Sequence, residues 1–266
     1  MSVERTDITF SFGENWRSFV TTLTEQDIQR SAEDITAWLP KEQILGKVVI
    51  DIGSGSGIHS LCFHKLGAAR LVSFDVDPSS VDATKTLWRA AGSPATWEVH
   101  EASILAPDTI RRFPPADLVY SWGVLHHTGD IWKAIDNASR MVLPHGYLWI
   151  AIYQGGPTYP KHLALKQRYN AASRWGKRWL EARTIGRIMA YRAIHGQNPF
   201  AWNAKQARGM TVYHDLIDWL GGLPYEVALE DEVLQFCRAR GFVLERIRVS
   251  AEGGCSRYLF RRSQIS

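Results

Sequence analysis

A short glycine-rich segment between two acids is the part of the chain best suited to hold a nucleoside. Its residues are Asp51, Gly53, Ser54, Gly55 and Gly57. Glycines at alternate positions permit positive φ and let a ligand lie against the backbone. Asp75 stands twenty residues after Gly55. A carboxylate there can accept hydrogen bonds from both hydroxyls of a ribose, an interaction of about 1.5–3 kcal/mol.

Histidines supply a second kind of chemistry, because their pKa lies near neutral pH. Two groups stand out, His126 with His127 and His214 with Asp215. We predict that His127 and His214 are the catalytic residues, which accept a proton from a substrate or orient it. A purely structural role for either histidine stays open. The weaker candidates are Tyr153, Tyr169 and Tyr213.

Strands and helices that alternate with short connections must position these residues. Strands are predicted at Val48–Ile50, Leu71–Phe74, Thr96–Val99, Leu118–Ser121 and Tyr147–Tyr153. Helices are predicted after the glycine segment, from Pro78, and over about 129–142, the last one stopped by Pro144 and Gly146. This alternation indicates a doubly wound α/β fold, a mostly parallel Rossmann-like sheet covered on both faces. Ligands bind such sheets beyond the carboxyl ends of the strands, where Asp51 falls.

The chain divides into four segments by pattern. They are an N-terminal helical extension (1–45), the strand-helix core (46–154), an irregular helical insertion (155–228) and a final helix with strands (229–266). The further elements are helices near Glu25–Leu39 and Asp231–Arg240 and strands at Phe242–Val249 and Tyr258–Phe260. We expect the insertion to be a helical cap that acts as a substrate lid.

The composition excludes several classes of protein. The 266 residues are 45% apolar and 22% charged, with a net charge of +4, which argues against a disordered or fibrous chain. Three scattered cysteines favour a reducing cytoplasm and neither a disulfide framework nor a metal site. No run of about 18 apolar residues and no leader pattern is present, so we expect neither secretion nor a membrane span.

The insertion is basic and rich in aromatic residues. Its basic residues are Lys161, Lys166, Arg168, Arg174, Lys177, Arg178, Arg183, Arg187, Arg192, Lys205 and Arg208, against four acids. A solvated basic face is one interpretation, and a lid for an acidic, partly apolar molecule is another. Contact with an anionic membrane surface is a third. Nucleic acid is less favoured, because RNA enzymes usually have a broader basic bias.

Five motifs in order resemble those of class I S-adenosylmethionine-dependent methyltransferases. They are VVIDIGSGSGIHS at the glycine segment, FDVDPSS, ASIL, DLVYSWGVLHHTGD and LPHGYLWIAIY. The glycine spacing G-x-G-x-G differs from the dinucleotide fingerprint G-x-G-x-x-G. The resemblance covers residues 45–153 and the final elements, and is strongest to the small-molecule group similar to quinone-biosynthesis methylases. It implies a sheet of seven strands with the last antiparallel.

The resemblance also implies roles for individual residues toward S-adenosylmethionine, whose product is S-adenosylhomocysteine. Asp51 approaches the methionine amino group beside Gly53 and Gly55, Asp75 holds the ribose, and Val76 packs on the adenine. Around the adenine edge and the methyl group it places Ser103, Ile104, Ser121 and Trp122. Substrate contacts are predicted for Trp16, His126, Tyr153, Arg208 and Tyr213. Trp16 and Phe12 would form a flap, although a simple anchor for the terminus is as consistent with the sequence.

Methyl transfer to an oxygen of a small acidic or partly apolar molecule is therefore the leading interpretation, with nitrogen or carbon as lesser alternatives. No D/N-P-P-Y/F motif follows the fourth strand, where Ser121–Val124 stands, which argues against amide or adenine-amino methylation. The sequence has no G-x-S-x-G elbow and no Pro-Cys pair that would suggest a mechanism with a covalent intermediate. The alternatives are an RNA methyltransferase and an inactive nucleoside-binding regulatory protein.

Overall fold

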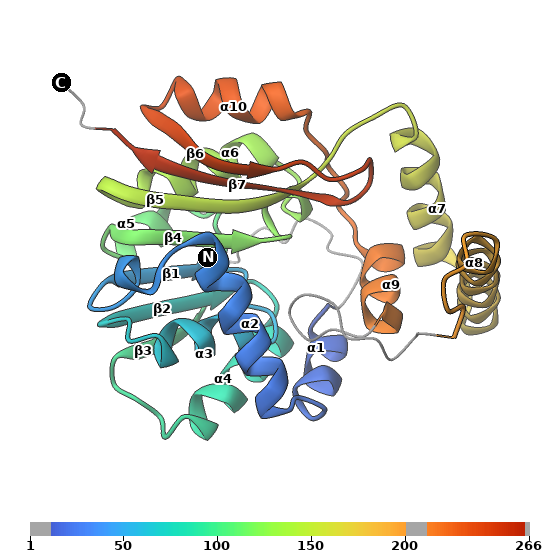
Figure 1. The fold of residues 1–266 in the computed structure, drawn as a ribbon, viewed down its shortest axis with the longest axis horizontal. Helices are drawn as coiled ribbons and strands as arrows, with labels where there is room; N and C mark the ends of the chain where they lie inside the picture. The colour runs from blue at the N-terminus through green and yellow to red at the C-terminus, as the bar shows by residue number, and fades with distance from the viewer. Residues whose placement is uncertain (1–11, 201–211, 264–266) are drawn as a thin grey trace.

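A seven-stranded sheet organises the molecule in the computed structural model, which describes residues 12–200 and 212–263. The strands are β1 Val48–Ile52, β2 Arg70–Asp75, β3 Trp97–Glu101, β4 Ala116–Trp122, β5 Val142–Tyr153, β6 Phe242–Arg248 and β7 Cys255–Arg262. Their order is β3-β2-β1-β4-β5-β7-β6, with β7 antiparallel to both neighbours and the other described pairs parallel (Figure 1). The predicted seven-stranded, mostly parallel fold is confirmed.

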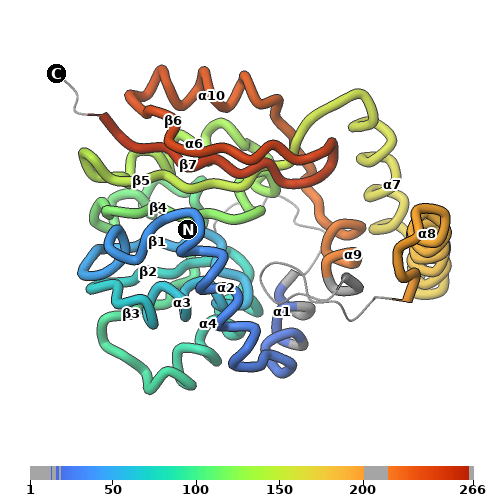
Figure 2. Tube along the Cα trace, in the orientation of Figure 1, coloured from blue at the N-terminus to red at the C-terminus, as the bar shows by residue number. Residues whose placement is uncertain are grey.

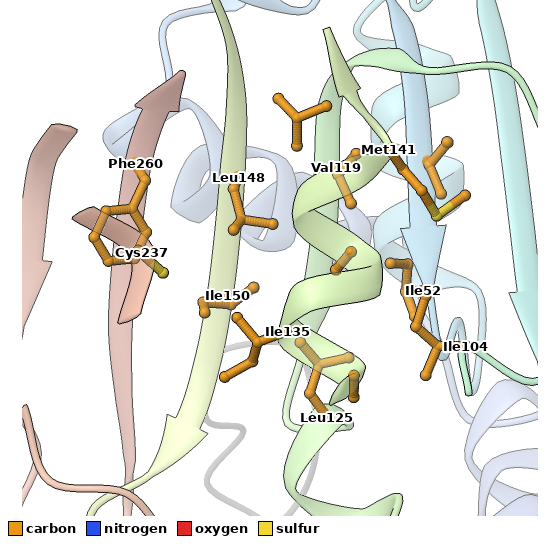
Figure 3. Close-up of a cluster of buried hydrophobic side chains, with 14 of the residues drawn as sticks. Ile52, Ile104, Val119, Leu125, Ile135, Met141, Leu148, Ile150, Cys237 and Phe260 are labelled. Carbon is orange, nitrogen blue, oxygen red and sulfur yellow. The ribbon is translucent and has the colours of Figure 1, made fainter. Parts of the chain in front are cut away.

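Helices cover both faces of this sheet. The helices of the described chain are α1 Phe12–Val20, α2 Glu25–Trp38, α3 Ile58–Lys65, α4 Pro78–Ala90, α5 Pro107–Arg112, α6 Ile131–Arg140, α7 Tyr159–Ala171, α8 Arg174–Ile194, α9 Val212–Gly221 and α10 Glu230–Arg238, with 3-10 turns η1 Lys41–Gln43 and η2 Leu125–His127. One core cluster joins α6 and α10 to the sheet (Figure 3), and a second joins α2, α3 and α4 to the other face.

Alternation along the strands explains the two cores. In β1, Ile50 and Ile52 face the α6 side, whereas Val49, which precedes Ile50, faces α2 and α3. Successive side chains of a strand point to opposite faces, so a strand buried on both sides must be apolar at nearly every position. The run VVIDI meets this condition except at Asp51. A buried carboxylate in such a strand indicates a functional role.

The fifth strand differs from the prediction. Pro144 and Gly146 were expected to end the preceding helix, yet α6 ends at Arg140 and β5 already begins at Val142. The pairing of β4 with β5 shifts in register between Ala116 and Leu118. This irregularity accommodates Pro144 and Gly146 within β5. A Cβ at Gly146 would lie 2.9 Å from the Asp117 carbonyl oxygen, so glycine permits the close approach of the strands there.

Other predicted boundaries are off by a few residues, and α1 and α5 are additional elements within the described chain. The helix expected at Asp231–Arg240 is α10, and the strands expected at Phe242–Val249 and Tyr258–Phe260 are β6 and a longer β7. The helix α2 begins as the sequence suggests, with a capping box between Thr24 and Asp27.

Helices α7, α8 and α9 lie beside the carboxyl ends of the parallel strands, with α8 farthest from the sheet (Figures 1 and 2). They share a small core of Tyr169, Leu180, Leu216 and Leu220. The helix α1 packs mainly on α4. Within the described residues no helix is both long and apolar enough to cross a bilayer.

Candidate functional site

The glycine segment forms a tight loop at the carboxyl end of β1. Gly53, Gly55 and Gly57 have φ of 71°, 53° and 80°, which L side chains rarely adopt. A Cβ at Gly53 would lie 2.4 Å from the methyl groups of Val124, and one at Gly57 would lie 2.8 Å from the Thr84 Cα. The loop is therefore wedged between α4 and the turn after β4, and its conformation requires glycine.

Asp75 closes this loop from the end of β2. Its Oδ2 accepts the Gly55 N–H at 3.0 Å and its Oδ1 accepts the Asp77 N–H at 3.0 Å. Burial raises the pKa of Asp75 to about 6, although these backbone hydrogen bonds oppose the shift. Each carboxylate oxygen retains accepting capacity for a ribose hydroxyl. Val76 is exposed beside it, available to contact a base.

Asp51 is a buried carboxylate at the end of β1. Ser60 donates to its Oδ2 at 2.5 Å, and a chain of hydrogen bonds continues from Ser60 to Ser73 and from Trp97 Nε1 to Ser73. Burial raises the pKa of Asp51 to about 7, and the nearby charge of Asp75 adds to the increase. A cation placed beside it would favour the ionised form, which suits an amino group as the ligand.

The N-terminal helix α1 lies on the glycine loop. The indole of Trp16 is the nearest group to Gly55, because a Cβ built there would lie 3.2 Å from its Nε1 and Cε2. Gly13 N–H donates to Asp77 Oδ2 at 2.9 Å and joins α1 to the loop that follows β2. Trp16 therefore covers the predicted cofactor loop. The side chain of Phe12 lies outside the described part of the chain.

Several predicted cofactor contacts place their side chains elsewhere. Ile104 packs in the core and Ser121 is fully buried, its hydroxyl donating to the Ile52 carbonyl at 3.1 Å. Ser103 accepts the Leu105 N–H with its hydroxyl. Side chains alternate along β4, which turns Ser121 inward, whereas Ile104 lies in the turn after β3 and packs in the core. Motif position alone could not decide how these side chains are buried, and their contact with the cofactor stays a prediction.

Trp122 and Ser54 lie at the rim of the site. Trp122 is the last residue of β4, and the Arg257 guanidinium lies over its ring, 4.4 Å from the ring centroid. Ser54 hydrogen-bonds through its hydroxyl to Thr84, whose own hydroxyl also donates to the Gly55 carbonyl. Thr84 thus supports the loop from α4, a role that sequence inspection missed because threonine in a helix carries no distinctive signal.

His126 and His127 lie together at the turn η2. His126 Nδ1 accepts the Tyr153 N–H at 3.2 Å, so the proton of its neutral ring sits on Nε2. His127 Nδ1 is 2.5 Å from the Pro224 carbonyl and donates to it, which leaves Nε2 as the accepting atom. Burial lowers the pKa of His127 to about 3. Both rings pack on Tyr153, with centroids 4.0 and 5.4 Å away.

Lys166 of α7 joins this group and was not singled out by the sequence. It is fully buried, in contrast to the solvated basic face expected for the insertion. Its Nζ donates to the Trp219 carbonyl and lies 5.7, 4.6 and 4.5 Å from the ring centroids of Tyr153, Trp219 and Tyr225, three rings that we call the aromatic box. As one of eleven basic residues it has no separate signal in the sequence.

The remaining predicted residues lie outside what the structure describes. Arg208 falls between residues 201 and 211, and nothing is described of the side chains of Tyr213 and His214 at the start of α9. The end of α9 does reach the site, because a Cβ at Gly222 would lie 2.7 Å from His127 Cε1. In the described residues no group of three His, Cys, Asp or Glu side chains is arranged to hold a metal ion.

Comparison with known proteins agrees with this geometry. Residues 50–150 match the model of a protein family described as a methyltransferase domain. This region of the chain is similar to a methyltransferase domain. The domain spans β1 to most of β5 and includes Asp51, the glycine loop, Asp75 and both site histidines. The acids and glycines thus occupy the matched region, whereas Lys166 lies beyond it.

Solved structures of methyltransferases share the fold. The magnesium protoporphyrin IX methyltransferase of Synechocystis PCC 6803 with bound S-adenosylhomocysteine is 14% identical, with a TM-score of 0.57 over 94% of each chain. An S-adenosylmethionine-dependent methyltransferase of Mesorhizobium loti is 16% identical, with a TM-score of 0.53 over 86% of this chain and 96% of that one. The likeness establishes the fold of the methyltransferase domain.

Curated relatives match over a short stretch. The ribosomal protein L11 methyltransferase of Tolumonas auensis is 31% identical over 114 residues, which are 43% of this chain and 36% of that protein. The enzyme of the same name from Alteromonas mediterranea is 47% identical over 55 residues, 21% of this chain and 19% of its own. The chain thus spans about a third or less of the length of these relatives.

Proposed function

We propose that the protein transfers the methyl group of S-adenosylmethionine to an oxygen of a small acidic or partly apolar molecule. The observation that carries the proposal is the pair of acids, the buried Asp51 and the half-buried Asp75, on either side of a glycine loop in the region that matches a methyltransferase domain. The raised pKa of both carboxyls suits a site that waits for a cationic ligand.

The chain's own residues fit this cofactor. Asp51 would hold the amino group, Asp75 the ribose hydroxyls, and the exposed Val76 the adenine. When bound, S-adenosylmethionine supplies an activated methyl group, so the protein mainly has to orient the acceptor and exclude water. Trp16 lies where it would exclude water from the loop.

His127 is suited to orient the acceptor hydroxyl. Its Nδ1–H is held by the Pro224 carbonyl, so Nε2 is the atom that can accept a hydrogen bond from that hydroxyl. A base works best when its pKa lies near the working pH, whereas that of His127 is about 3. We therefore favour orientation over proton abstraction for this residue. The role of His214 stays a prediction.

A small acceptor is favoured over a protein or an RNA. His127 lies against Gly222, directly after α9, and Lys166 belongs to α7. Both His126 and Lys166 are fully buried, which suits a molecule enclosed by the cap. The curated relatives named for ribosomal protein L11 make a protein acceptor the main alternative. They match over 114 or 55 residues, a third or less of their own length, so they give little information on the acceptor.

A second proposal concerns α8, which we infer makes peripheral contact with an anionic membrane surface. Trp175 and Trp179 are 79% and 55% exposed on a helix that carries six basic residues and one acid. Exposed indoles beside basic side chains favour a lipid headgroup layer. We further propose a cytoplasmic location, supported by three free cysteines.

Calorimetric titration of S-adenosylmethionine and S-adenosylhomocysteine tests the proposed function. We expect micromolar binding to the wild type and affinity at least about tenfold weaker in Asp75→Ala, because charge-assisted hydrogen bonds to the ribose are lost. Asp108→Ala, at an exposed acid of α5, is the matched control and should bind as the wild type does. Absence of binding by the folded wild type would overturn the proposal.

A further inference from the structure

Lys166 is a buried amine without an acid bound to it. Its side chain is fully buried, and the salt bridges among the described residues do not include it. Of the three N–H groups of a lysine ammonium, one donates to the Trp219 carbonyl. Burial of an ammonium is costly unless its remaining donors are satisfied. The side chain therefore needs a further explanation.

The aromatic box explains part of its stability. Ring faces within about 6 Å attract an ammonium, and three rings lie 4.5 to 5.7 Å from Nζ. The ring faces accept no ordinary hydrogen bond, and the Trp219 carbonyl is the one acceptor described for Nζ, so two N–H groups of Lys166 stay available to a ligand in the described structure. The box also supplies flat apolar surface beside the charge.

Two more donors without a described hydrogen-bond partner lie around the ring of Tyr153. The buried His126 Nε2, which carries the proton of its ring, and the buried Tyr225 hydroxyl have no hydrogen-bond partner among the described residues. The rings of His126 and Tyr225 lie 4.0 and 5.3 Å from that of Tyr153, which Lys166 also contacts. Buried polar groups are nearly always paired, so three donors around one ring indicate a missing acceptor of hydrogen bonds.

The titratable groups that face Lys166 leave room for that acceptor. Asp218 of α9 and Cys255 of β7 lie close enough to raise the pKa of Lys166, which burial lowers to about 7. Neither forms a described salt bridge with Lys166. His126 and His127, from η2, interact with its charge and have lowered pKa values, so they are neutral near pH 7. The tyrosines of the box have pKa values raised by burial and are neutral too.

We propose that Lys166, His126 and Tyr225 form a subsite that binds a carboxylate group of the methyl acceptor. A carboxylate accepts several hydrogen bonds at once and compensates the buried ammonium. The subsite lies at the ends of β4 and β5, and Val124, two residues before His126, contacts Gly53 of the cofactor loop. The carboxylate would thus anchor an acceptor beside the cofactor. This inference rests on the proposed function.

Paired ligands test the subsite in the protein saturated with S-adenosylhomocysteine. The probes are hydroxylated aromatic and aliphatic carboxylates, each with its neutral amide, starting with 4-hydroxybenzoate and 4-hydroxybenzamide. Calorimetry should give at least one pair in which the acid binds the wild type about tenfold or more tightly than the amide. Lys166→Met, which keeps length and apolar packing, should remove this preference and leave amide binding unchanged.

Two controls separate the possible causes. Lys161→Met, at an exposed lysine of the same helix, should retain the preference of the wild type, and Lys166→Arg should retain part of it. All variants should bind S-adenosylhomocysteine equally well, which shows that they fold. An unchanged preference in Lys166→Met, or no preference in any pair for the wild type, overturns the subsite while the proposed function stands. No binding of S-adenosylhomocysteine overturns both.

A measurement on the wild type alone covers the case in which Lys166→Met does not fold. Because the Lys166 cation is lost as the pH rises above about 7, acid binding should weaken about tenfold between about pH 6.5 and 8.5. The enthalpy should vary with the buffer, since protons are taken up on binding at the higher pH. The facing histidines have pKa values lowered by burial and the tyrosines have pKa values raised by burial, so neither group is expected to titrate in this range. Acid affinity independent of pH overturns the subsite.

Discussion

The two acids of the cofactor loop illustrate how single residues are prepared for a ligand. Asp51 is held by Ser60 and Asp75 by two backbone N–H groups, yet burial raises the pKa of both. Both carboxyls thus bind protons more tightly in the folded protein than in the unfolded chain. Their contribution to the free energy of unfolding therefore decreases as the pH rises from about 4 to about 7. A cationic ligand would oppose that decrease.

Cofactor binding should consequently depend on pH through Asp51. Its pKa is about 7 in the unliganded protein, and the amino group of S-adenosylhomocysteine requires the ionised carboxylate. We expect affinity for S-adenosylhomocysteine to increase about tenfold or more between about pH 5.5 and 7.5, measured by calorimetry. Asp51→Asn should bind weakly and with little pH dependence. A wild-type affinity that is flat across this range would argue against contact between Asp51 and the amino group.

Among the secondary-structure elements, two helices outside the matched domain, α1 and α8, lie in different environments. The helix α1 packs on α4 and lies over the glycine loop, whereas α8 lies at the far side of the cap (Figure 1). Their tryptophans differ in environment, because Trp16 is half-buried against Gly55 and Trp175 is exposed. Trp16 is therefore placed to cover the predicted cofactor loop, whereas Trp175 faces solvent.

Removal of the Trp16 indole should shorten the residence of the cofactor. Trp16→Ala is expected to increase the dissociation rate of S-adenosylhomocysteine about three- to tenfold, since an indole contact contributes on the order of 1 kcal/mol, with little change in thermal stability. Surface plasmon resonance measures that rate. Trp175→Ala serves as control and should leave it unchanged. Slower dissociation in Trp16→Ala would mean instead that the indole competes with the cofactor.

The α8 surface should bind anionic vesicles. Sedimentation with phosphatidylserine vesicles is expected at about 50 mM salt and lost at about 500 mM, because salt screens the basic residues. The double change Trp175→Ala and Trp179→Ala should reduce the partition coefficient about tenfold. Val243→Ala, at an exposed apolar residue of β6, is the control. Equal binding to phosphatidylcholine, or binding to RNA but not to vesicles, would contradict the membrane assignment.

In the whole molecule, one edge of the sheet gathers elements that are distant in the chain. The carboxyl ends of β1, β2, β4 and β5 bring Asp51, Asp75, His126 and Tyr153 to that edge, and α1 and the cap lie against it (Figures 1 and 2). Parallel strands with right-handed crossovers produce this arrangement whatever ligand is bound. In the proposed function, the region that matches the methyltransferase domain would supply the cofactor side, and residues 155–228 would supply the acceptor side.

The sequence alone determined the cofactor side, because its signals are local. Apolar runs, a glycine loop and acids at strand ends are read over a few residues, and they predicted the fold together with Asp51 and Asp75. Only the tertiary structure decided that Lys166 is buried, that Ile104 and Ser121 turn inward, and that Trp16 lies on Gly55. Such facts depend on contacts between residues far apart in the chain. A basic residue in an amphipathic helix has the same local pattern whether it meets water or an aromatic box.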